Sequence, residues 1–80
     1  MNLADCREGY AYEVLGVESG CMRAGRLASL GFLPGVVVRV AHVAPLGDPV
    51  AVEMPGQEIS VRLTEARLVK VRELRGGILG

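Results

Sequence analysis

The chain has 80 residues, half of them hydrophobic, and nine Lys or Arg balance nine Asp or Glu. A domain of this size builds one thin core, so a large catalytic cleft is not expected. Zero net charge argues against binding to nucleic acid, because that affinity comes mainly from Lys and Arg that neutralise phosphates; it also removes repulsion between copies, which favours a homo-oligomer.

Two cysteines, Cys6 and Cys21, are too few for the disulfide framework of a small secreted domain. The first fifteen residues are too rich in charge for a signal peptide, and no apolar run approaches the ~20 residues of a membrane helix. We therefore expect a cytoplasmic chain without direct membrane insertion.

Gly and Pro divide the chain into short segments whose hydrophobic residues alternate with period two, as in strands. This pattern predicts strands over residues 10–17, 36–44, 50–54, 59–63 and 69–72. A bulge is expected at Gly16, a type II turn at residues 33–36 and a hairpin turn at residues 55–56.

Helical spacing replaces this alternation after Ser19, which suits the N-cap of a helix of roughly ten residues that ends at Gly31. Thr64 is expected to cap one further helical turn before the last strand. The predicted fold is mainly β: a small, partly closed SH3-like barrel of about five strands, with an OB-like barrel as the alternative. Residues 1–73 form the domain, and residues 74–80 are expected to be a flexible tail.

The side chains offer little for catalysis, because His42 is the only histidine and its spacing from either cysteine suggests no nucleophile and base. An enzyme is therefore not expected, and no cofactor is required. Cys6, Cys21 and His42 are candidate metal ligands, but the cysteines lack the close spacing of structural zinc sites. They predict at most a weak site for a divalent transition metal. Alternatively, Cys21 packs as a small hydrophobe and His42 ends a strand.

Hydrophobic residues exceed what one small core can bury, both after the helix and along the long strand at residues 36–44. Two interpretations remain open. The surplus forms an exposed groove for a protein partner, or the inserted helix covers it.

The segment RLASLGFLPG at residues 26–35 resembles the ferrous iron transport protein A (FeoA) family. The loop APLGDP at residues 44–49 and the segment VRLTEA at residues 61–66 are also similar to that family. Together with Leu3, Asp5 and Gly9, the resemblance covers about residues 3–72.

The resemblance implies a cytoplasmic, non-enzymatic SH3-like barrel that works with the membrane Fe(II) transporter FeoB, whose cytoplasmic part binds GTP. The same barrel occurs in iron-dependent repressors, where a pair of DNA-binding helices precedes it; this chain shows none. Two hypotheses follow. The chain docks on FeoB and modulates transport, or it is an Fe(II) carrier or sensor.

For docking, we expect one apolar groove in which Phe32 and Leu33 supply most of the affinity. Replacing both by Asp is expected to abolish binding without unfolding the barrel. Arg26 is either an arginine finger that reaches toward nucleotide or a supporting surface charge. The predicted partner-binding residues are Arg26, Leu30, Phe32, Leu33, Pro34, Leu46, Asp48 and Pro49.

Overall fold

The computed structural model describes residues 1–18 and 22–74. The elements are η1 (Leu3–Asp5), β1 (Ala11–Val17), α1 (Met22–Leu30), β2 (Val37–Val43), β3 (Val50–Met54), β4 (Gln57–Val61), α2 (Leu63–Ala66) and β5 (Val69–Glu73). The mainly β prediction is confirmed, with its five strands, one inserted helix and one helical turn. The predicted N-cap Ser19 and residues 75–80 of the predicted tail lie outside the described residues.

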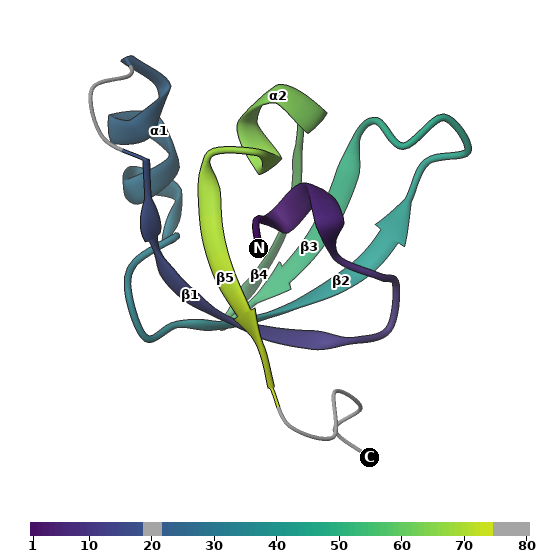
Figure 1. Ribbon diagram of the computed structural model, residues 1–80, viewed down its shortest axis with the longest axis horizontal. Helices are drawn as coiled ribbons and strands as arrows, with labels where there is room; N and C mark the ends of the chain where they lie inside the picture. Colours follow the sequence, from purple (N-terminus) through teal and green to yellow (C-terminus); the bar gives the residue numbers. More distant parts are fainter. Residues whose placement is uncertain (19–21, 75–80) are drawn as a thin grey trace.

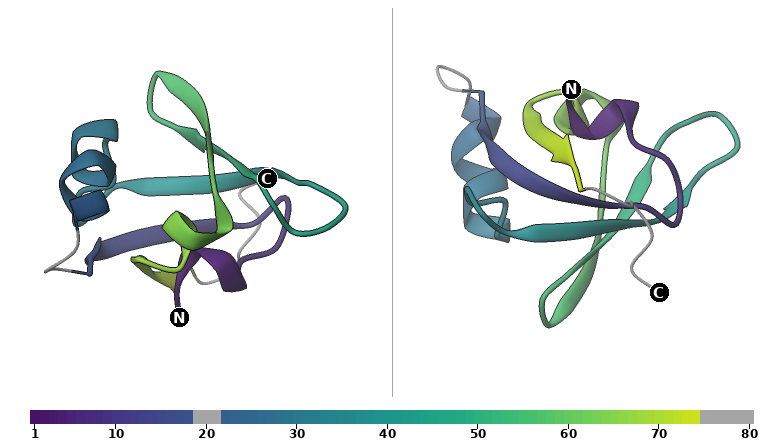
Figure 2. Two further views of the ribbon diagram at one scale, coloured as in Figure 1. Left: turned by 90° about the horizontal axis from the view of Figure 1, so that it is seen from above. Right: turned by 60° about the horizontal axis from the view of Figure 1, so that its bottom comes forward.

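The five strands form one antiparallel sheet in the order β4-β3-β2-β1-β5 (Figure 1). The sheet curves around the core, which the two further views also show (Figure 2), and β1 and β2 pass beneath η1 and α2 in Figure 1. The edge strands β4 and β5 are not hydrogen-bonded to each other within residues 1–18 and 22–74, so the barrel remains open along one seam.

The period-two pattern places one side of each strand in the core. Val14, Val38, Val40 and Val52 are each at most 1% exposed, and the last strand adds Val69 and Val71. The 3-10 turn η1, which the sequence did not predict, contributes the buried Leu3. The core therefore draws on both ends of the described chain as well as on the central strands.

The bulge predicted at Gly16 is confirmed, since the pairing of β1 with β5 shifts between Val14 and Gly16. The hairpin turn is confirmed too, because Met54 pairs with Gln57 across residues 55–56. Gly31 ends α1 at φ +115°, and a Cβ atom there would lie 3.1 Å from Met54 Cε. Glycine is therefore favoured at position 31 for two reasons: the backbone there is left-handed, and it passes close to a side chain of β3.

Helix α1 extends across the open seam of the sheet. Its Leu27 is fully buried in the core, and Arg26 forms an ion pair with Glu65 of α2, just before the edge strand β5. At its other end, the Leu30 carbonyl accepts a hydrogen bond of 2.8 Å from Gln57 Nε2 on the edge strand β4. Of the apolar surplus, Phe32 is buried, whereas Leu33, Val37 and Leu46 remain exposed.

The prediction that Thr64 caps the last helical turn is wrong. Helix α2 begins at Leu63, and Arg62 occupies the cap position with extended backbone angles. The N–H of Arg62 donates to Glu65 Oε1 at 3.1 Å. The carboxylate three residues into the turn thus takes the hydrogen bond that stabilises its start.

Candidate functional site

The two halves of the predicted apolar groove lie at opposite ends of β2. Residues 33–36 form the turn before this strand, and residues 44–49 form the loop after it (Figure 1). Seven extended residues between them correspond to about 20 Å. The prediction of one continuous groove is therefore wrong, and the two segments have to be considered as separate surfaces.

Phe32 cannot line a docking surface, because it is 1% exposed and belongs to the hydrophobic core. Its backbone N–H donates to the Leu27 carbonyl at 3.2 Å, which turns the chain inward directly after α1. Leu30 is half-buried against the same core. The expectation that Phe32 contributes affinity is corrected: this side chain stabilises the fold.

The loop of residues 44–49, which we call the β2–β3 loop, carries the most exposed large hydrophobic residue of the described chain. Leu46 is 94% exposed, with the exposed Pro45 and Pro49 on either side of the loop. The loop is closed by two backbone hydrogen bonds, from Ala44 N–H to the Pro49 carbonyl at 3.2 Å and from Gly47 N–H to the Ala44 carbonyl at 2.7 Å. Leu46 thus projects from a loop with defined backbone contacts.

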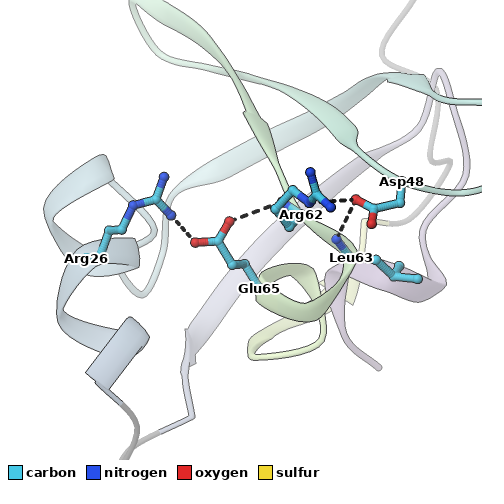
Figure 3. Close-up of polar contacts among 5 residues, drawn as sticks. All are labelled: Arg26, Asp48, Arg62, Leu63 and Glu65. Atoms are coloured by element: carbon cyan, nitrogen blue, oxygen red, sulfur yellow. Dashed lines mark hydrogen bonds and ion pairs between the residues drawn. The ribbon is translucent and has the colours of Figure 1, made fainter.

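Asp48 fixes the β2–β3 loop to the start of α2. Its Oδ1 atom accepts a hydrogen bond of 3.0 Å from the N–H of Leu63 and lies 3.5 Å from Nε of Arg62 (Figure 3). The Leu63 N–H is one of the first amides of α2, which have no partner within the helix. Asp48, predicted as a partner-binding residue, therefore has a structural role in positioning Leu46.

The Arg26 side chain is partly exposed, and its guanidinium points toward Glu65 (Figure 3). Glu65 is 6% exposed, and its two oxygens contact the Arg26 guanidinium and the Arg62 N–H. A carboxylate buried to this extent needs such partners, because desolvation penalises an unpaired charge. The geometry therefore explains Arg26 as a supporting charge. Sequence reasoning did not identify Glu65 as its partner. Its spacing from Arg62, three residues into a helical turn, was the available signal.

A second apolar surface lies at the other end of β2. Leu33 is 50% exposed and Val37 42% exposed, and the adjacent Pro34 is exposed as well. Sequence reasoning missed Leu15, which is 51% exposed on β1. Its outward position follows from the alternation with the buried Val14, a signal that the sequence contained.

Cys6 and His42, the two candidate metal ligands within the described residues, do not belong to a metal-binding cluster there. Cys6 Sγ lies 3.5 Å from the Asn2 carbonyl, and burial raises the pKa of the Cys6 thiol to about 12. A thiol held in its neutral form is a poor ligand, because metals bind the thiolate. Cys21 lies outside the described residues.

His42 has one carboxylate beside it. Its Nδ1 atom lies 3.2 Å from Glu8 Oε1, and the same oxygen accepts a hydrogen bond of 2.6 Å from the Val43 N–H. Both side chains are largely exposed. Across residues 1–18 and 22–74, no three His, Cys, Asp or Glu side chains are grouped to hold a metal ion.

Among the helices of the described segments, none is both long and apolar enough to span a bilayer.

Comparisons with known proteins place this geometry in a family. The model of the FeoA domain matches residues 1–73. A solution structure of FeoA from Chlorobium tepidum is 34% identical with a TM-score of 0.81, over 92% of this chain and 70% of that chain. A crystal structure of Stenotrophomonas maltophilia FeoA complexed with zinc, described as a prokaryotic SH3 domain protein, is 29% identical with a TM-score of 0.80, over 90% and 89%.

A manganese-dependent transcriptional repressor is similar in fold alone. It is 19% identical with a TM-score of 0.82, and the match covers 92% of this chain and 41% of the repressor. The likeness to the Stenotrophomonas protein confirms the predicted SH3-like architecture. Because the family model spans nearly the whole chain, the chain belongs to the FeoA family, which is linked to ferrous iron transport.

Proposed function

We propose that this chain is an accessory protein of ferrous iron uptake that docks on the FeoB transporter through the β2–β3 loop and modulates transport. The observation that carries the proposal is Leu46, 94% exposed on a loop that Asp48 ties to α2. Family membership supplies the link to ferrous iron transport.

The physical argument rests on how the leucine is presented. Full burial of a leucine side chain in a partner's apolar pocket contributes about 1.5–3 kcal/mol. A loop that already holds its bound shape loses less conformational entropy on association, so more of this free energy appears as affinity. The contacts of Asp48 with Leu63 and Arg62 supply such preorganisation.

The test is binding to detergent-solubilised FeoB, measured by biolayer interferometry with and without a GTP analogue. Leu46→Asp is expected to weaken binding at least tenfold, because a charge replaces the anchoring side chain. Leu33→Asp is the matched control: it is the same substitution at an exposed leucine beyond the other end of β2. Circular dichroism verifies that both variants are folded.

The expected pattern is loss of binding for Leu46→Asp and retention for Leu33→Asp. The reverse pattern would assign docking to the other surface and overturn the role of the loop. Absence of wild-type binding in either nucleotide state would overturn the proposed partner itself.

A second candidate function is direct binding of Fe(II) as a carrier or sensor. It rests on the proximity of Glu8 and His42, whose oxygen and nitrogen atoms are 3.2 Å apart, and on the zinc complex of the Stenotrophomonas relative. Two exposed donors leave the remaining coordination positions to water, which predicts weak affinity. Anaerobic Fe(II) titration tests it: micromolar, stoichiometric binding that His42→Ala removes would favour this function over docking alone.

A further inference from the structure

A continuous series of polar contacts joins α1, α2 and the β2–β3 loop (Figure 3). It begins at Arg26 of α1, whose guanidinium contacts one oxygen of Glu65, while the other oxygen of Glu65 accepts from the Arg62 N–H at 3.1 Å. It ends at Asp48, whose Oδ1 atom lies 3.5 Å from Arg62 Nε and accepts from the Leu63 N–H at 3.0 Å. The start of α2 is therefore held from two sides, by α1 and by the loop.

The two holding contacts fall on consecutive peptide units. The Arg62 N–H binds Glu65, and the next N–H, that of Leu63, binds Asp48. Helix α2 has four residues, so both hydrogen bonds belong to a single turn. The first amides of a helix have no backbone partner within it, so both depend on side-chain acceptors. A movement of one peptide unit is therefore passed directly to the other.

Glu65 makes this series sensitive to Arg26. The Glu65 residue is 6% exposed, whereas the Arg26 side chain is 55% exposed. Loss of the guanidinium leaves the buried carboxylate without this ion pair, and desolvation then favours rotation of the carboxylate toward water. That rotation breaks the hydrogen bond with the Arg62 N–H and releases the start of α2.

We propose that Arg26 is a positioning residue for docking: through Glu65 and α2, it holds the β2–β3 loop in the shape that presents Leu46. This role rests on the proposed docking function, because it concerns the loop that carries the anchoring side chain. The loop is thereby coupled to α1, the helix that bridges the open seam of the sheet. Coupling of this kind is reciprocal, so a partner that binds the loop also stabilises α1.

Native-state hydrogen exchange of the full chain, followed by NMR, measures this coupling without any partner. The two reporters are the Gly47 N–H, which donates to the Ala44 carbonyl at 2.7 Å within the loop, and the Leu63 N–H. The reference for global opening is the N–H of Val52, a residue fully buried in the central sheet. Relative to this reference, Arg26→Ala is expected to speed the exchange of both reporters at least about tenfold, because a buried charge loses its partner.

Two further variants separate the Arg26 contact from general effects of losing a charge. Arg26→Lys keeps a cation beside Glu65 and is expected to restore most of the protection. Arg72→Ala is the matched control, because it removes another Arg–Glu pair, that with Glu13, from an arginine side chain that is 59% exposed. This pair joins β5 to β1, so the exchange of Gly47 should remain unchanged.

An Asp48→Ala background shows whether Arg26 acts through the series. Once Asp48 is removed, Arg26→Ala should add less than about twofold to the exchange of Gly47, whereas independent effects would multiply. Unchanged exchange in Arg26→Ala, no rescue by Arg26→Lys, an equal effect of Arg72→Ala, or multiplying effects would each overturn the positioning role. Absence of binding to FeoB would overturn the docking function alone, since none of these exchange rates involves FeoB.

Discussion

Phe32 and Leu33 are neighbours in sequence, yet the structure assigns them opposite roles, which a pair of alanine substitutions can separate. Phe32 is 1% exposed in the core, so Phe32→Ala leaves a cavity that costs about 3–5 kcal/mol. Leu33 is half exposed, and Leu33→Ala is expected to cost less than about 1 kcal/mol. An 80-residue domain has a total stability of only about 4–12 kcal/mol, so the first change removes a large fraction of it.

Urea denaturation followed by circular dichroism measures the difference. With a slope of about 1–3 kcal/mol per molar urea, Phe32→Ala should lower the midpoint by about 1 M or more, whereas Leu33→Ala should barely move it. If Phe32→Ala is unfolded in water, the milder Phe32→Leu keeps the comparison measurable, with an expected loss of about 1 kcal/mol. Equal midpoints for Phe32→Ala and wild type would refute the assignment of Phe32 to the core.

Three further predictions concern the polar contacts. Asp48→Ala is expected to lower the free energy of unfolding by about 1 kcal/mol in urea denaturation, and Asp48→Asn by less, because the amide oxygen can still accept the helix N–H. Glu65→Ala removes both the ion pair with Arg26 and the acceptor at the start of α2, and should cost about 1–3 kcal/mol in the same assay; an unchanged midpoint would contradict this. Burial raises the pKa of the Cys6 thiol from 9.0 to about 12. The protonated thiol therefore makes its full contribution to the free energy of unfolding below pH 9, and this contribution is lost as the pH rises toward 12. In a Cys21→Ser background, alkylation of Cys6 at pH 8.5 should be much slower in the native than in the urea-unfolded chain, and equal rates would contradict its burial.

The strands could be predicted because their hydrophobic residues alternate and Gly or Pro separates them. The bulge at Gly16 and the turn at residues 55–56 followed from local backbone chemistry in the same way. The 3-10 turn η1 could not be predicted, because its buried Leu3 is stabilised by contacts with residues distant in sequence, including α2 and β5.

The candidate site was predicted less well, because a surface depends on which segments the fold brings together. Sequence reasoning recognised Leu33 and Leu46 as surplus hydrophobic residues but assigned them to one groove, although the strand predicted over residues 36–44 already lay between them; the structure places them beyond opposite ends of β2. It also grouped Phe32 with them, whereas the turn after α1 directs this residue inward. Arg26 and Asp48 could be recognised as notable, but their partners are 39 and 15 residues away, a distance that local patterns do not reach.

The pairing of β1 with β5 has a consequence for how the chain folds during synthesis. Val14 pairs with Val71, and the Met1 carbonyl accepts a hydrogen bond from Val71 N–H, so the first strand is completed by the last. Bringing Val71 to Val14 closes the long chain segment between them, and this closure costs conformational entropy before the contacts between β1 and β5 compensate for it. While the ribosome still holds the last strand, β1 has an unpaired edge and the core lacks Val69 and Val71. The domain should therefore fold in one step after release of its C-terminal residues, and nascent chains that end before residue 69 should be protease-sensitive.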